Sequence, residues 1–153
     1  MRQRSNLSLH LLTGESMEWK DEFKHGLIWQ DFQHKQLVDN INILINSVTT
    51  ASNVDKSFKN AAYFTVNYCN GHFKIEEEYM KRHGYPLMDK HVKQHGSFIK
   101  KFNRIIKEKS LSDVEKSSEL LHDLLDWFTD HIMAEDKYLA NFLIRHEIDR
   151  PYR

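Results

Sequence analysis

The chain has 153 residues, enough for one domain with a hydrophobic core and too few for two domains of ordinary size. Its 22 basic and 22 acidic residues give a formal net charge of zero, so bulk charge provides no attraction to nucleic acid or to an anionic membrane surface. The single cysteine, Cys69, excludes an internal disulfide and fits a reducing compartment.

Residues that break helices are rare, since the chain has five glycines and two prolines. This composition predicts an all-α fold of long helices joined by short turns. No run reaches the roughly 18 apolar residues that a membrane-spanning helix requires. We therefore expect a cytoplasmic protein with no nucleic-acid partner and no membrane contact, and the sequence indicates no particular protein partner.

Residues 1–16 (MRQRSNLSLHLLTGES) form an N-terminal extension that we expect to be flexible. Arg2 and Arg4 precede an apolar run, as in a signal peptide, but polar residues interrupt the run and no small-residue cleavage site follows. Export is therefore not expected. An upstream start, an expression remnant and a flexible arm remain alternative interpretations, and we assign the folded domain to residues 17–153.

Residues 17 to about 30 contain aromatic side chains without helical periodicity, and Gly26 argues against one continuous helix, so this stretch predicts an arm packed across the fold. Asp31 is a candidate N-cap for a first helix. His34 lies on the apolar stripe of that helix, where a lone histidine is more often a core residue than a metal ligand. The other members of the stripe are Leu37, Val38, Ile41, Leu44 and Ile45.

The polar stretch TTASNVDKS (49–57) predicts a loop in which Asn53 or Asp55 caps a second helix over about 56–83. On its inner face Cys69 is expected to act as a small buried hydrophobic residue rather than as a ligand. The expected inner face comprises Phe58, Ala62, Thr65, Cys69, His72, Glu76 and either Tyr79 or Met80.

Gly84 and Pro86 predict a turn, because glycine adopts the left-handed helix cap and proline cannot continue a helix. A third helix then runs from about Asp89 to Lys109. Ser112 and Glu115 have the spacing of a capping box and begin a fourth helix. Its apolar stripe comprises Leu120, Leu121, Leu124, Leu125, Phe128, Ile132, Leu139 and Phe142.

Two pairs of potential metal ligands, His72 with Glu76 and His91 with His95, are each spaced four residues apart. Residues four apart on an α-helix lie about 40° apart around its axis and therefore share a face. Imidazole and carboxylate together suit iron or zinc better than magnesium or calcium. For either pair alone, surface polar residues on an amphipathic helix are the alternative interpretation.

The fourth helix adds His131 and Asp136, which are five residues apart and so about 140° apart on an α-helix. Asp136 would have to reach inward between helices, which suits a bridging carboxylate better than a chelate with His131. Four such helices joined by short turns predict an up-down-up-down antiparallel four-helix bundle with an N-terminal arm, and bundles of this kind place metal sites in the core. Each predicted helix supplies at least one candidate ligand.

The strings DFQHKQL, HFKIEEEYM, GYPLMDKHVKQH and WFTDHIMAEDKY resemble, in order, the signature segments of the hemerythrins, most closely the single-domain bacterial ones. The resemblance covers about residues 17–144, and all seven ligand positions of the family pattern carry the appropriate residue type. It implies a non-haem di-iron centre bridged by an oxo or hydroxo group that binds dioxygen reversibly. The implied ligands are His91, His95 and His131 on one iron, His34 and His72 on the other, and Glu76 and Asp136 as bridges.

By the same resemblance, Phe73, Trp127 and Phe128 line the dioxygen pocket. Two residues depart from the family pattern: Phe128 stands where a leucine is more frequent, and Gln30 stands where an apolar residue is usual. Neither is expected to touch a ligand. The histidines that match no ligand position are interpreted as structural or surface residues; they are His10, His25, His83, His122 and His146.

The leading hypothesis is a dioxygen-binding protein for storage, delivery or sensing, and not an enzyme, because no acid, nucleophile or polar cluster of substrate size accompanies the ligands. A di-iron enzyme acting on peroxide or nitric oxide is the alternative. A zinc or iron protein without redox chemistry ranks last, because five histidines and two carboxylates exceed what one tetrahedral zinc site requires.

Overall fold

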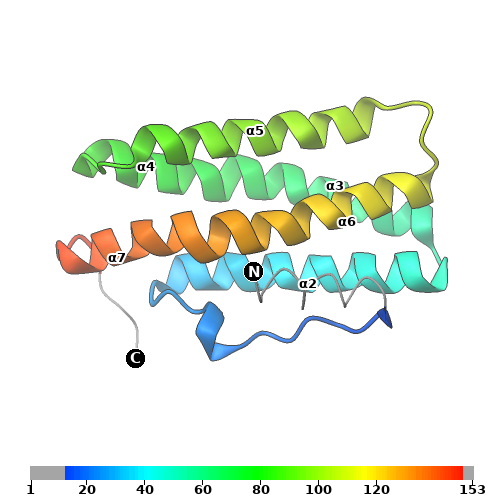
Figure 1. Ribbon diagram of the computed structural model, residues 1–153, viewed down its shortest axis with the longest axis horizontal. Helices are drawn as coiled ribbons and strands as arrows, with labels where there is room; N and C mark the ends of the chain where they lie inside the picture. The colour runs from blue at the N-terminus through cyan, green and yellow to red at the C-terminus, as the bar shows by residue number, and fades with distance from the viewer. Residues whose placement is uncertain (1–12, 150–153) are drawn as a thin grey trace.

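The computed structural model describes residues 13–149. Residues 1–12, most of the predicted flexible extension (1–16), lie outside the described residues. Within the described part every regular element is helical, and four long helices pack as an antiparallel bundle (Figure 1). The predicted all-α four-helix bundle is confirmed. None of the described helices is long and apolar enough to cross a membrane.

The first long helix, α2, spans Ile28–Thr50, so it begins before the predicted cap. The prediction of Asp31 as N-cap is wrong: Leu27 occupies that position, and its carbonyl accepts the first helical hydrogen bond from the Asp31 N–H. The Asp31 carboxylate instead accepts hydrogen bonds from the backbone N–H groups of His25 (2.7 Å) and Gly26 (3.0 Å). It therefore fixes the loop that leads into the helix.

The second long helix is continuous but changes its hydrogen-bond pattern: it comprises α3 (Val54–Tyr68), the π-helical η2 (Cys69–Phe73) and α4 (Lys74–His83). Asn53 occupies the N-cap position, as one of the two predicted alternatives, although its side chain makes no capping hydrogen bond. Because α2 continues to Thr50, the loop before this helix is shorter than predicted. Gly84 ends the helix with φ = 63°, in the left-handed cap expected of it.

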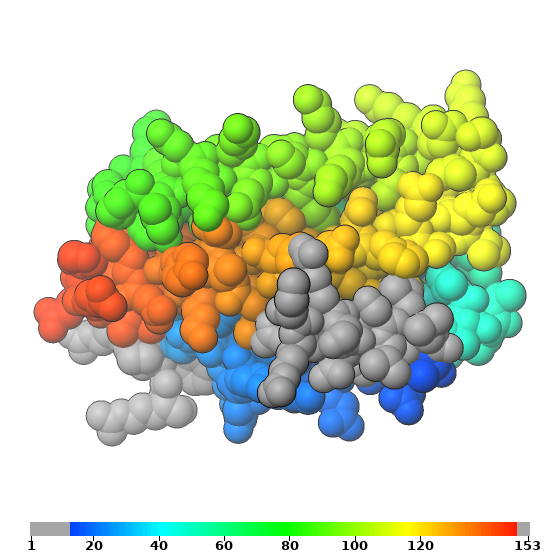
Figure 2. All heavy atoms as spheres, viewed as in Figure 1, coloured from blue at the N-terminus to red at the C-terminus, as the bar shows by residue number. Residues whose placement is uncertain are grey.

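The third long helix is α5 (Met88–Lys107), and the fourth comprises α6 (Asp113–Trp127), the π-helical η3 (Phe128–Asp136) and α7 (Lys137–Arg145). The predicted capping box is present, because Glu115 N donates to Ser112 Oγ at 3.2 Å and Ser112 N donates to Glu115 Oε2 at 2.7 Å. In Figure 2 the side chains of α5 pack against those of α6 and α7 along the length of the molecule.

The described N-terminal residues form an arm that runs beside α2 and includes the short 3-10 helix η1 (Asp21–Phe23) (Figure 1). The Asn42 side chain holds the arm: its Oδ1 accepts from Met17 N at 2.6 Å and its Nδ2 donates to Met17 O at 2.9 Å. Met17, Phe23 and Leu27 are buried. The predicted packed arm is confirmed for residues 17–27, whereas residues 28–30, which the prediction included, belong to α2.

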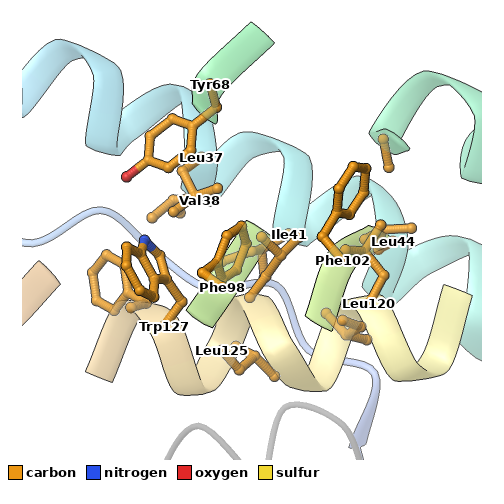
Figure 3. Close-up of a cluster of buried hydrophobic side chains, with 14 of the residues drawn as sticks. Leu37, Val38, Ile41, Leu44, Tyr68, Phe98, Phe102, Leu120, Leu125 and Trp127 are labelled. Carbon is orange, nitrogen blue, oxygen red and sulfur yellow. The ribbon is translucent and has the colours of Figure 1, made fainter. Parts of the chain in front are cut away.

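The apolar interior is divided into a large cluster and a small one. Figure 3 shows part of the large cluster, with Leu37, Tyr68, Phe98 and Trp127 pointing toward one another from four helices. The small cluster, at the other end of the bundle, consists of Leu27, Met80, Tyr85, Leu139, Ala140 and Leu143. On every long helix the predicted ligand positions lie between residues of these two clusters, so a polar layer is enclosed by apolar packing at both ends.

Candidate metal centre

The structure brings all seven predicted ligand side chains into that polar layer, and each is at most 2% exposed. Their potential ligand atoms form two overlapping groups, and within each group the atoms lie within 4.8 Å of one another. The first group contains Glu76, His91, His95, His131 and Asp136. The second contains His34, His72 and Asp136.

Asp136 lies between the two groups, and its two oxygens face different histidines. Its Oδ1 is 2.9 Å from His131 Nε2 and 3.0 Å from His91 Nε2. Its Oδ2 is 2.9 Å from His34 Nε2 and 3.5 Å from His72 Nε2. This carboxylate therefore has the arrangement required to bind one cation with each oxygen.

Glu76 provides the second carboxylate of the layer. Its Oε1 is 3.0 Å from His72 Nε2, 3.4 Å from His95 Nε2 and 3.7 Å from His91 Nε2. Since His72 belongs to one group and the other two histidines to the other group, Glu76 also lies where the two groups meet.

The π-helical segment η3 explains why Asp136 reaches the site. On an ordinary α-helix Asp136 would share the face of His131 poorly, as the sequence predicted. In a π-helix the hydrogen bond runs between residues five apart, so residues at that spacing stack on one face. The His131 Nε2 to Asp136 Oδ1 distance of 2.9 Å is the consequence. The second π-helical segment, η2, contains His72.

Three histidines are held from behind through their Nδ1 atoms, each by a residue on the preceding long helix. Gln33 Oε1 contacts His72, Glu77 Oε1 contacts His95 at 2.9 Å, and Gln94 Oε1 contacts His131 at 2.7 Å. An oxygen acceptor at Nδ1 requires the proton there, which leaves the Nε2 lone pair facing the layer. These three acceptors were not predicted from the sequence, although each is the chain neighbour of a predicted ligand.

Several atoms that face into the layer are buried and make no hydrogen bond within the described chain: the Nε2 atoms of His72, His91, His95 and His131, with Glu76 Oε1 and Asp136 Oδ1. Buried polar atoms without partners are costly, so such a concentration requires an explanation. Bound cations explain it, because they would accept the lone pairs of the nitrogens and of the oxygens together. The residues present therefore fit a metal site.

The charges of the layer are strongly coupled. Burial and the neighbouring Asp136 raise the pKa of Glu76, but the facing histidines outweigh both effects and hold this pKa well below its usual value. The pKa of Asp136 is also well below its usual value, because its facing histidines outweigh the effect of burial. Burial lowers the pKa of His72 and His91, but the two carboxylates reverse the effect and raise these values to about 9 and about 10. Without metal, protons therefore take part of the role of the cations.

Aromatic rings cover the histidines on the side of the large apolar cluster. Phe73 stacks on His95 with ring centroids 4.0 Å apart, and Trp127 stacks on His131 at 3.7 Å. The Tyr68 ring stacks on His72 at 4.7 Å, a contact that was not predicted from the sequence. Phe128 is buried, and its ring packs edge-on against Phe23 of the arm at 5.0 Å.

The expectation that Gln30 touches no ligand is wrong. Gln30 is fully buried, and its amide nitrogen donates a hydrogen bond to Glu76 Oε2 at 3.1 Å. His25, whose ring nitrogen is 3.1 Å from Gln30 Oε1, is a buried structural residue. His122 and His146 are exposed and His83 is partly exposed, as expected of non-ligands, whereas His10 lies outside the described residues.

Cys69 is buried beside the layer but is not a member of either ligand group. Burial raises the pKa of its thiol to about 12. A protonated thiol is a poor metal ligand, so the interpretation of Cys69 as a small hydrophobic residue is confirmed in its packing.

Five imidazoles and two carboxylates converging from four antiparallel helices define a metal-binding four-helix-bundle protein. Residues 25–143 match the family model described as "Hemerythrin HHE cation binding domain". The chain belongs to the hemerythrin family.

Proteins named bacteriohemerythrin and myohemerythrin are similar to the chain over most of its length. The chain is 31% identical over 122 residues to the bacteriohemerythrin of Clostridium acetobutylicum, covering 78% of this chain and 95% of that protein. It is 29% identical to the bacteriohemerythrin of Stenotrophomonas maltophilia, covering 84% and 82% of the two chains. A myohemerythrin from Theromyzon tessulatum is 25% identical over 80% of this chain and 89% of its own length.

Proposed function

We propose that this protein binds dioxygen reversibly at a non-haem di-iron centre and serves in oxygen storage, delivery or sensing rather than as an enzyme. In this proposal His91, His95 and His131 would bind one iron, His34 and His72 would bind the other, and the two carboxylates would bridge them. An oxo or hydroxo group would complete the bridge. When bound, the iron pair supplies electrons and one open coordination position for dioxygen.

The observation that carries the proposal is the set of buried, inward-facing Nε2 and carboxylate atoms without hydrogen-bond partners among the described residues. The Asp136 oxygens support two ions rather than one, because each oxygen faces a different pair of histidines at 2.9–3.5 Å. Imidazoles with carboxylates suit iron, and a single tetrahedral zinc would use only four of the seven side chains.

The two irons would have unequal numbers of histidine ligands, three and two, and this difference supports an open coordination position on one of them. With two shared carboxylates, three histidines complete one ion more fully than two histidines complete the other. We place the vacancy beside His34 and His72, with Phe73, Trp127 and Phe128 as the apolar lining. The rings of Phe73 and Trp127 are buried and stack on His95 and His131 of the neighbouring group. They support an apolar wall around the layer, which would exclude water and external reductants, whereas the placement of the vacancy rests on the number of histidines. A cytoplasmic location fits the single buried thiol of Cys69.

The test is optical. Metal-free protein is loaded anaerobically with ferrous iron and its metal content is measured; exposure to air should then produce a charge-transfer colour that bleaches when oxygen is removed. His72→Ala should lose one iron and the reversible colour. The matched control is His122→Ala, because His122 is exposed and its Nδ1 bonds the Ser118 carbonyl of its own helix, away from the polar layer.

Two results would contradict the proposal. A protein that takes up iron but oxidises irreversibly in air, and that then consumes peroxide or nitric oxide catalytically, would establish the di-iron enzyme instead. Retention of both irons and of the reversible colour in His72→Ala would contradict the ligand assignment.

A further inference from the structure

Gln30 connects the start of α2 to both carboxylate-bearing helices. Its amide nitrogen donates to Glu76 Oε2 at 3.1 Å and to the backbone oxygen of Asp136 at 3.2 Å. A primary amide has two N–H donors, so both are used. The side chain is fully buried, and therefore these bonds do not compete with solvent.

His25 fixes which way the Gln30 amide points. The amide oxygen is 3.1 Å from His25 Nδ1. His25 is itself held in place, because its backbone N–H and that of Gly26 donate hydrogen bonds to the Asp31 carboxylate. If the amide were rotated by half a turn, its oxygen would face two acceptors, the Glu76 carboxylate and the Asp136 carbonyl. The donor orientation toward Glu76 is therefore the only one that these neighbours satisfy.

We infer, on the basis of the proposed di-iron function, that Gln30 is a positioning residue that holds Glu76 and favours the ferrous state of the centre. A hydrogen bond donated to a carboxylate ligand withdraws negative charge from it, and ferric ions need that charge more than ferrous ions do. Hydrogen bonds to ligands tune the reduction potentials of iron sites in this way. This effect slows the loss of the oxygen-binding ferrous form.

The reaction that Gln30 slows is oxidation by dissolved dioxygen. Two ferrous ions give one electron each to one dioxygen molecule, which takes two protons from solvent and leaves as hydrogen peroxide, so that two ferric ions remain. Removing the Gln30 donor should lower the reduction potential and accelerate this reaction.

Gln30→Met tests the inference, because methionine is unbranched and of similar length but carries no N–H donor. Iron content, midpoint potential by spectroelectrochemistry and oxidation rate in air are measured against the wild type. Outer-shell changes of this kind typically cost tenfold or more, so we expect roughly tenfold faster oxidation. A tenfold greater preference for the ferric state corresponds to a potential lower by about 59 mV per one-electron step. Gln36→Met is the matched control, because Gln36 lies exposed on the same helix.

His25→Phe provides a second variant that does not alter any group bonded to Glu76. Without the His25 contact the Gln30 amide is free to rotate, so His25→Phe should lower the potential and speed the oxidation, as Gln30→Met does but to a smaller extent. If Gln30→Met does not retain two irons, His25→Phe decides: a lowered potential supports the inference and an unchanged one overturns it. Unchanged potentials and rates in both variants also overturn it. Failure of the proposed function is distinct, because it would be seen in the wild type as absence of an iron pair or of reversible colour.

Discussion

Glu77 gives the sharpest test of how the histidines are oriented. Its Oε1 accepts a hydrogen bond from His95 Nδ1 at 2.9 Å, across from α4 to α5. Glu77→Leu removes the acceptor, so the His95 ring loses the bond that selects its tautomer and directs Nε2 to the metal. Glu77→Gln keeps an oxygen acceptor in place without the charge.

The expected magnitude follows from the exposure of Glu77. Loss of a histidine's outer partner costs about ten- to a hundredfold in metal affinity. The Glu77 side chain is 38% exposed, so water partly replaces the lost acceptor, and we expect the lower end of this range. A tenfold loss corresponds to about 1.4 kcal/mol. Glu77→Gln should lose less, and the stability of the metal-free protein should change by less than about 1 kcal/mol.

The assay is competition for ferrous iron, and separately for zinc, against a chromophoric chelator, combined with urea unfolding of the metal-free protein. Glu78→Leu is the control, because Glu78 is the exposed neighbour on the same helix. Equal metal affinities for Glu77→Leu and Glu78→Leu would refute the reasoning. So would an affinity loss in Glu77→Gln as large as that in Glu77→Leu, because it would show that charge rather than the acceptor matters.

Three further predictions concern protons, the thiol and the capping box. His72 and His91 have raised pKa values of about 9 and about 10, so the metal-free protein carries both protons at pH 7 and metal binding should release one from each. The release should decrease as the pH rises through these two values, because the histidines then lose their protons before metal binds; calorimetry in buffers of different ionisation enthalpy measures it, and a release that does not change with pH would contradict the raised pKa values. Burial raises the Cys69 pKa to about 12, so iodoacetamide at pH 8 should label native protein far more slowly than urea-unfolded protein, and equal rates would contradict the burial. Ser112→Ala should lower stability by about 1 kcal/mol and the melting temperature by about 2–4 °C, whereas an unchanged melting curve would show that the capping box contributes nothing.

Local rules predicted the features that lie within one helix. The apolar stripe of α2, the capping box at Ser112 and the left-handed cap at Gly84 depend on neighbours only a few residues away. The His72–Glu76 spacing needs nothing beyond a helical repeat, and these two side chains lie 3.0 Å apart. Asp31 shows where local rules fail: its residue type suits a cap, but its carboxylate bonds the preceding loop.

Contacts between helices could not be predicted in the same way. The acceptors of the His72, His95 and His131 Nδ1 atoms lie 39, 18 and 37 residues away in the chain. Gln30 looked like a misplaced polar residue because its partner Glu76 is 46 residues away. The residue pattern within one helix carries no information about partners that are this far away in the chain.

By itself, the sequence determined that the chain forms helices, which faces are apolar, and which side chains are available as ligands, because these properties follow from residue type and helical repeat. Only the tertiary structure decided that Asp136 shares a face with His131, since the π-helical hydrogen-bond pattern of η3 replaces the α-helical one there. It also decided which neighbouring glutamines and glutamate hold the histidines, because those bonds exist only after the helices have packed together.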